Sequence, residues 1–175
     1  ILDFLWRRCR DESRGMYHYY ADGRPQLLGL LTDQVAMARA LVAAYEDTGE
    51  PSYLERARLL AGVMARDFAH PEGGFYDRAE EPGAQGYLSR RLRVLDENAA
   101  AAELVHRLYL WTNDITYQET ARSTLRALAG SYGGYGRLAA GFALAVARAV
   151  FPAVMVKVSR ADSPQGQRLY QDSLG

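Results

Sequence analysis

Cysteine is nearly absent from this sequence of 175 residues, in which Cys9 is the only one. An intrachain disulfide is therefore excluded, and we expect a reducing compartment, with the cytoplasm as the default. An excess of charge is also absent, because 21 basic residues balance 21 acidic ones. Nucleic-acid-binding domains normally carry a basic stripe, so we expect no nucleic-acid partner.

Long apolar runs are scarce as well. The strongest, LAAGFALAVARAVFPAVMVKV from Leu138, contains Arg148 and is interrupted by Pro152. The proline leaves about 14 residues for a continuous helix, fewer than the ~20 that cross a bilayer. We interpret the run as a buried helix followed by a strand, and expect no membrane span. The opening ILDFLWRRCRDES starts within an amphipathic pattern without a leader, so we expect the chain to be cut from a longer one.

Motifs of the common cofactor sites are missing too. The sequence has no P-loop, no G-x-G-x-x-G that opens a helix, no H-E-x-x-H and no cysteine and histidine spacing typical of zinc. We therefore expect neither a metal ion nor another cofactor.

The sequence does contain a repeat. LTDQVAMARALVAAYEDTGEPSYLERA, from Leu31, aligns without a gap with LDENAAAAELVHRLYLWTNDITYQETA, from Leu95. The alignment pairs Leu31 with Leu95, Asp33 with Glu97, Gln34 with Asn98, Tyr45 with Tyr109, Thr48 with Thr112, Tyr53 with Tyr117 and Ala57 with Ala121. An internal repeat decides the fold, so the two copies are interpreted together.

Each copy predicts two helices. The first, at about 33–47 and 97–112, is apolar nearly all round, which is typical of a helix covered on several sides. The second, at about 53–68 and 117–132, has one apolar stripe and one polar face, which is typical of an outer helix. The links are short, and Gly49 or Asn113 can adopt the left-handed conformation that ends a helix. Each copy is therefore predicted to be an antiparallel hairpin.

Long segments precede each hairpin. RGMYHYYADGRPQ precedes the first and echoes GGFYDRAEEPGAQ before the second, where GGFYD and GYLSRRLRVL are strand-like. A further inner helix is predicted at 137–151, and AVMVKVSR reads as a strand. We predict an all-α fold, a partial (α/α) toroid with long loops on one face and a short C-terminal strand. Residues 1–152 would form the hairpin domain, and 153–175 a strand and a polar segment.

This pattern of inner and outer helices resembles the α/α toroids, which include six-hairpin glycosidases and N-acyl-glucosamine epimerases. The wording of LLTDQVAMARALVAAYEDTGEPSYLERA, EGGFYD and ENAAAAELVHRLYLWTND is similar to the C-terminal part of the thioredoxin-domain proteins related to the spermatogenesis-associated thioredoxin-like protein. The resemblance covers about 15–160 and implies a carbohydrate-like ligand. That family has an N-terminal thioredoxin fold with paired cysteines, which this chain lacks. A closed toroid needs about twice as many hairpins, so we expect a missing segment or a partner chain to complete it.

Two acid and amide pairs are the main candidates for chemistry. Asp33 and Gln34, like Glu97 and Asn98, fall in the first turn of an inner helix just after a long loop. Adjacent helix axes lie roughly 8–10 Å apart, which could place Asp33 and Glu97 on either side of a sugar ring as catalytic acid and base. The alternative is structural, because acids are favoured in a first turn and Thr32 or Asp96 could be the N-cap. Gln34 and Asn98 could bind substrate or tie down the loops.

Loop residues would line the same mouth. Tyr19 and Tyr76 offer flat faces for a sugar and Asp77 offers hydrogen bonds, although such residues also pack loops against helix ends. Among the histidines only His18 lies where it could reach a ligand. We expect a helix N-terminus to lower the pKa of each carboxylate, which suits a base or a nucleophile.

Overall fold

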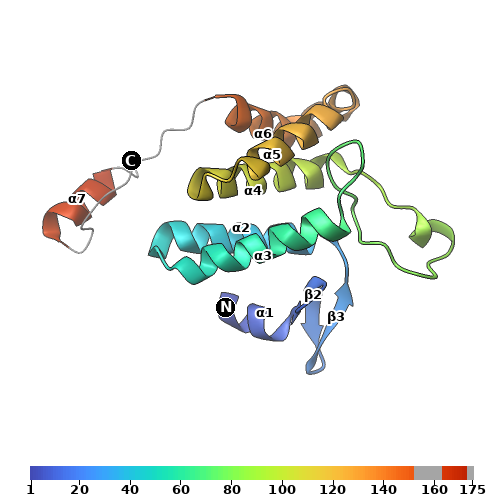
Figure 1. Ribbon diagram of the computed structural model, residues 1–175, viewed down its shortest axis with the longest axis horizontal. Coiled ribbons are helices and arrows are strands. Elements are labelled where there is room, and N and C mark those ends of the chain that lie inside the picture. The colour runs from blue at the N-terminus through green and yellow to red at the C-terminus, as the bar shows by residue number, and fades with distance from the viewer. Residues whose placement is uncertain (152–162, 173–175) are drawn as a thin grey trace.

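Two helical hairpins form the body of the protein, as the repeat predicts. The computed structural model describes residues 1–151 and 163–172. The first hairpin consists of α2 (Leu31–Thr48) and α3 (Pro51–Asp67), and the second of α4 (Leu95–Thr112) and α5 (Ile115–Leu128). Figure 1 shows the hairpins stacked side by side, with the inner helices α2 and α4 adjacent.

The turns within the hairpins follow the predicted chemistry. Gly49 and Asn113 end the inner helices with φ of 71° and 57°, in the left-handed region. The outer helices then begin with side-chain caps, because Glu50 accepts a hydrogen bond from the backbone N–H of Ser52 and Asp114 one from that of Thr116. The tight turn predicted in both copies is confirmed.

Two helices near the end of the chain are shorter than predicted. The outer helix α5 ends at Leu128 rather than near residue 132. The third inner helix, α6 (Ala140–Val150), begins only after a 3₁₀ segment, η2 (Tyr132–Ala139). The sequence GSYGGYG explains the difference, since glycines weaken a helix and Gly136 adopts a φ of 53°. The predicted strand AVMVKVSR lies outside the described residues. α7 (Pro164–Asp172) lies in the polar segment.

The first long segment is a β-hairpin, where the sequence was interpreted as a loop. After α1 (Leu2–Arg8), the strands β1 (Arg10–Asp11), β2 (Gly15–Ala21) and β3 (Arg24–Leu28) form an antiparallel sheet in the order β1-β2-β3. Asp22 and Gly23 make the turn with φ of 52° and 76°. An Asp-Gly pair between two runs of strand-forming residues is a strong sequence signal for a hairpin, which the interpretation as a loop did not take into account.

The second long segment, between α3 and α4, was interpreted as partly strand-like, but its described residues form no β-strand. Only isolated bridges occur there, at Ala69 with Phe75 and at Leu30 with Arg78. The stretch GYLSRRLRVL begins with a short 3₁₀ helix, η1 (Gly86–Ser89), and no strand neighbours it. The strand prediction for this stretch was therefore wrong, because β-branched and apolar residues alone do not make a strand without a partner.

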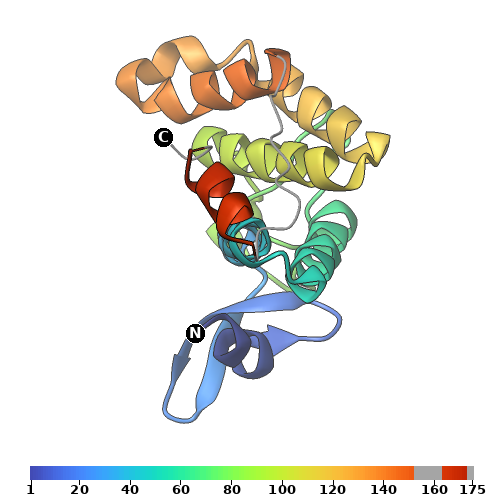
Figure 2. The same ribbon diagram turned by 90° about the vertical axis from the view of Figure 1, so that its left-hand side faces the viewer.

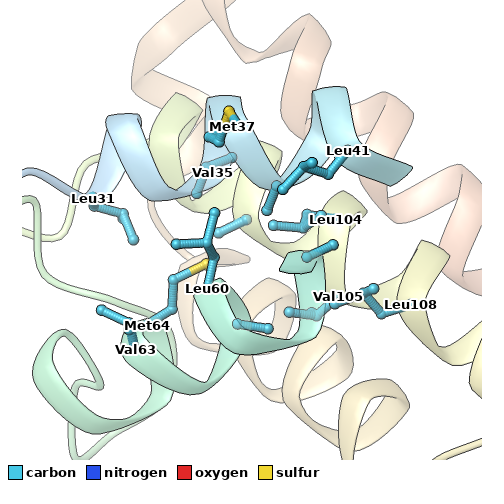
Figure 3. Packing of buried hydrophobic residues seen from close by; sticks show 14 of the residues in the cluster. Leu31, Val35, Met37, Leu41, Leu60, Val63, Met64, Leu104, Val105 and Leu108 are labelled. Atoms are coloured by element: carbon cyan, nitrogen blue, oxygen red, sulfur yellow. The ribbon is translucent and has the colours of Figure 1, made fainter. Parts of the chain in front are cut away.

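Two clusters of buried side chains hold the stack together. The larger lies between α2, α3 and α4 and includes Leu41, Leu60 and Leu104 (Figure 3). The smaller joins α4, α5 and α6 through Leu95, Leu125 and Phe142 among others. Figure 2 shows the sheet and α1 at one end of this stack and α6 at the other. No helix within residues 1–151 and 163–172 has the length and apolar character to span a membrane.

Candidate functional site

The first turns of α2 and α4 lie at the same end of the stack, where the long segments join the helices (Figure 1). Each helix begins two residues before its acid. The N-cap residues are Leu30 and Val94, without a side-chain cap bond, so the prediction of Thr32 or Asp96 as N-cap was wrong. The helices start early because Leu31 and Leu95 are buried as the first residues of the apolar faces.

The two amides make the same three hydrogen bonds. Gln34 accepts from the backbone N–H of Met16 at 2.7 Å, and donates to the carbonyl oxygens of Met16 at 3.0 Å and of Leu30 at 3.2 Å. Asn98 accepts from Phe75 N–H at 2.7 Å, and donates to the carbonyl oxygens of Phe75 and Val94 at 2.9 and 2.8 Å.

Neither amide offers a surface to a ligand in this structure. Both side chains have 0% exposure, and their hydrogen-bonding atoms face backbone groups. The sequence analysis left open whether Gln34 and Asn98 bind substrate or tie down the loops, and the hydrogen bonds correspond to the second alternative.

Glycine at the preceding loop position makes each clamp possible. A Cβ atom at Gly15 would lie 2.1 Å from Gln34 Oε1, and one at Gly74 would lie 2.7 Å from Asn98 Oδ1. Both glycines also have positive φ, 85° and 81°. The similarity of RGMY and GGFY in the sequence therefore reflects a repeated contact, in which a buried amide side chain holds the loop backbone. We call this contact the clamp; only glycine leaves room in it for the amide.

Asp33 lies beside a histidine in a small cavity. Its Oδ1 atom is 2.8 Å from His18 Nδ1, and its side chain is 13% exposed. The Oδ2 atom is buried without a hydrogen-bond partner. A cavity of about 270 Å³ between α1, β2 and α2 is lined by both residues and by Tyr19. Burial raises the pKa of Asp33, and the hydrogen bond and charge of His18 oppose that rise.

Glu97 has a different environment, although it occupies the same place in the repeat. Its Oε2 atom is buried without a partner. The pKa of Glu97 is raised to about 7, mainly by burial and further by the negative charges of Asp77 and Asp96, while the Arg78 guanidinium opposes the rise. We expected the helix N-terminus to lower both pKa values; this was wrong, because loss of hydration outweighs the helix dipole at these half-buried positions.

Asp77 joins the second long segment to the start of α2. Its Oδ1 atom accepts a hydrogen bond from Leu92 N–H at 2.8 Å, and Oδ2 pairs with Arg78 at 3.2 Å. Its backbone carbonyl accepts from Leu31 N–H at 2.9 Å, which joins this segment to the start of α2. Asp77 therefore brings a negative charge close to Glu97 while it fixes the loop. Arg78 was not among the residues singled out from the sequence, which gives no signal for it beyond its place next to Asp77.

The predicted aromatic residues differ in accessibility. Tyr19 is 47% exposed and its ring lies edge-on to His18, with centroids 6.0 Å apart. Tyr76 is half-buried, with the Arg91 guanidinium 3.9 Å from its ring centroid and the His70 ring at 4.7 Å. Tyr19 can therefore meet a ligand directly, whereas one side of Tyr76 is already occupied.

No ligand group for a metal ion stands out. In the part of the chain that the structure describes, no group of three or more histidine, cysteine, aspartate or glutamate residues is arranged to hold one. The arrangement at the loop end offers proton transfer by carboxyl groups, with Glu97 able to hold a proton near neutral pH.

Comparison with known proteins supports the fold. The chain is similar to the crystal structure of a family 76 glycoside hydrolase from a bovine Bacteroides thetaiotaomicron strain, with a TM-score of 0.64 and 16% identity. The match covers 99% of this chain and 40% of that chain, so this sequence spans two fifths of the length of the neighbour. No family model matches the sequence. No curated protein matches it either. The predicted six-hairpin glycosidase-like, partial α/α toroid fold is confirmed, and the relation to thioredoxin-domain proteins has no support in these comparisons.

Proposed function

We propose that the protein binds or acts on a carbohydrate-like substrate at the loop end of the inner helices, as a six-hairpin-glycosidase-like domain. The observation that carries the proposal is the Glu97 carboxyl group, which has a raised pKa of about 7 and an unpartnered buried oxygen at the first turn of an inner helix. A carboxyl group that keeps its proton at neutral pH is what protonation of a glycosidic oxygen requires. The name of the structural neighbour, a glycoside hydrolase, agrees with this chemistry.

The second carboxylate of the proposed reaction is Asp33. It lies on the adjacent inner helix, and the His18 imidazole favours its ionised form. We assign Asp33 the role of base or nucleophile and Glu97 that of acid. Tyr19 and His18 would contact the sugar beside Asp33, and Tyr76 and Asp77 would shape the site beside Glu97. Gln34 and Asn98 would position both carboxylates by fixing the loops.

A glycan screen tests this proposal. Binding of mono- and disaccharides is measured by NMR, and hydrolysis with glycosides of a chromogenic leaving group, for the protein and for the Asp33→Asn, Glu97→Gln double variant. We expect at least one sugar to perturb the residues around His18 and Asp33, and the double variant to lose turnover. A screen in which no sugar binds the folded protein would contradict the proposal.

A second candidate function is a non-catalytic helical-repeat scaffold, such as an interaction domain of a thioredoxin-associated protein. One observation favours it. Helix α6 and the segments beside it expose the apolar side chains of Leu138, Leu144, Val150 and Phe151. The inner helices α2 and α4 are each covered by an outer helix, whereas α6 has no such cover among the described residues. Hairpin stacks of this kind commonly bury such a face against the next repeat or a partner.

The same apolar face of α6 is also where further hairpins would pack if the toroid were completed. The structural neighbour is more than twice as long as this chain, so we propose that further hairpins, from a missing segment or a partner chain, cover α6. Sedimentation velocity of the protein and of a Leu144→Ser, Phe151→Ser variant distinguishes the candidates. A scaffold needs this face, so the variant should lose concentration-dependent association, whereas the sugar site at the other end of the repeat should be unaffected.

The single cysteine keeps the cytoplasm as the predicted location.

A further inference from the structure

A second cavity, distant in sequence from the loop end, lies between α4 and α6. Its volume is about 710 Å³, against about 270 Å³ for the cavity beside Asp33. Helix α4 contributes Glu103, His106, Arg107 and Leu110 to its lining, α6 contributes Ala147 and Arg148, and Phe151 follows directly after α6. None of these residues belongs to the acid and amide pairs, so the cavity is independent of the proposed sugar site.

His106 is the unusual residue of this cavity. It is only 8% exposed, and neither ring nitrogen makes a well-formed hydrogen bond among the described residues, although the ring contacts the backbone of Arg148. Buried polar groups are nearly always paired, and an unpaired one calls for an explanation such as a bound water, ion or ligand. The equivalent residue of the first repeat is Val42, which is buried in the apolar core. Packing at this position therefore does not require a histidine.

The charged side chains that line the cavity, Glu103, Arg107 and Arg148, leave a positive excess, which remains when their ion-pair partners are counted. Arg39, Glu103 and Arg148 form ion pairs across the three successive inner helices, so that one carboxylate meets two guanidinium groups. Arg107 pairs with Glu46 of α2. These five groups carry three positive charges against two negative ones.

Arg122 of α5 adds a further positive charge near the ring of His106. That charge lowers the pKa of His106 in addition to the larger effect of burial, and a contact of the ring with the backbone of Arg148 partly opposes both. A positively charged, partly enclosed surface with an unpaired imidazole is suited to an oxyanion, which accepts hydrogen bonds from guanidinium and imidazole N–H groups.

We propose that the cavity between α4 and α6 binds a small oxyanion, a carboxylate or phosphate group, through the imidazole of His106 and the guanidinium groups of Arg107 and Arg148. The ligand accepts a hydrogen bond from the imidazole and lies where the arginines exceed the glutamates in charge. The site is separate from the sugar site, and neither proposal depends on the other.

NMR of the histidine rings tests the proposal directly. The ¹⁵N-labelled protein is titrated with inorganic phosphate and, separately, with acetate, and sodium chloride at matched ionic strength is the control. The His106 ring signals should shift and saturate with at least one anion, while those of His18 and His70 should not. Saturation with one anion alone identifies a phosphate or a carboxylate ligand. A His106 response to both anions no larger than the response to chloride would overturn the proposal.

Three variants test the residues. Arg107→Gln and Arg148→Gln should each lower the affinity for the anion roughly tenfold, which is the effect of losing one charge-assisted hydrogen bond. Arg126→Gln, which removes an exposed arginine of α5 outside the cavity lining, is the matched control and should leave the affinity unchanged. Equal affinities in the Arg107, Arg148 and Arg126 variants would contradict the site.

His106→Val tests the imidazole itself. The first repeat tolerates valine at the equivalent position, so we expect a folded variant in which the anion no longer raises the melting temperature. If that variant does not fold, the two arginine variants still decide the question, because their side chains are partly exposed.

Discussion

The first turns of the inner helices α2 and α4 are alike in the contacts of their amide residues and different in the contacts of their acidic residues. Gln34 and Asn98 bond to the same backbone groups of the preceding loop and of the residue four positions earlier. Asp33 and Glu97, one residue earlier in each copy, have different neighbours: a histidine for the first, and two carboxylates with an arginine for the second. The repeated feature is therefore architecture, and the feature that diverged is where two different chemical roles can arise.

The largest effect should come from breaking the shared clamp. Gln34→Ala and Asn98→Ala each leave a buried backbone N–H and carbonyl without a partner, so each should lower the free energy of unfolding by about 2–4 kcal/mol. Because the clamps are equivalent, the two losses should agree within roughly 1 kcal/mol. Urea denaturation measures both, with Gln85→Ala, at an exposed loop glutamine, as the control. A loss in only one copy would show that the clamps are not equivalent.

The glycines of the clamps should show a graded effect. Gly15→Ala places its Cβ closer to the amide oxygen than Gly74→Ala does, 2.1 against 2.7 Å. Both changes also strain a backbone with positive φ. We expect losses of about 1–3 kcal/mol, larger at Gly15. Gly23→Ala is the control for positive φ without a clash, since no atom lies within 4 Å of its Cβ. Equal losses at all three glycines would mean that strain alone, not the amide contact, sets the cost.

The acids should differ in how stability depends on pH. The pKa of Glu97 in the folded protein is raised from 4.5 to about 7, so the folded state binds more protons than the unfolded state between these values. Stability should therefore fall as pH rises through this window. Glu97→Gln should remove that slope and stabilise the protein above pH 7, by roughly 1–3 kcal/mol after allowance for solvent screening.

Asp33→Asn provides the contrast to that change. The pKa of Asp33 is also raised, but the imidazole of His18 offsets part of the effect of burial. The gain from Asp33→Asn at high pH should therefore be smaller than that from Glu97→Gln, as thermal unfolding across pH measures. A gain at Asp33 that equals or exceeds the gain at Glu97 would contradict the proposed division of roles.

The smallest change concerns the partner of Asp33. His18→Gln removes the imidazole whose hydrogen bond and charge hold the pKa of Asp33 down, so that pKa should rise further. The effect on stability should be small because the contact is partly exposed. The shift of the Asp33 carboxyl carbon with pH, measured by NMR, reports it. His70→Gln, at a histidine that contacts Tyr76 and Arg93 rather than Asp33, should leave the Asp33 titration unchanged. An unchanged titration in His18→Gln as well would show that the contact is not formed in solution.

The sequence predicts the hairpins well because their causes are local. Apolar periodicity defines the inner and outer helices, and Gly49 and Asn113 mark the same left-handed turn in both copies. The loops were harder. The hairpin turn at Asp22 and Gly23 follows a recognisable sequence signal, whereas the stretch GYLSRRLRVL has strand-like residues but no neighbouring strand among the described residues.

The candidate site was predictable in its positions but not in its electrostatics. The alignment singles out Asp33 and Glu97, and a sequence can show that both begin a helix. It cannot show that Asp77, in the long loop that leads into α4, lies close enough to raise the pKa of Glu97, or that hydration is lost at both carboxyl groups. Those two effects reverse the direction of the pKa change that a helix N-terminus alone predicts.

A pH titration of the side-chain carboxyl carbons in the unmodified protein tests the central claim most directly. With selective ¹³C labelling of aspartate and glutamate, and assignment through Asp33→Asn and Glu97→Gln, the account predicts that Glu97 titrates near pH 7 and Asp33 at a lower pH, above the ordinary aspartate value. Titration of both residues at ordinary carboxylate values would contradict it, because the two repeats would then carry the same kind of acid and no proton donor.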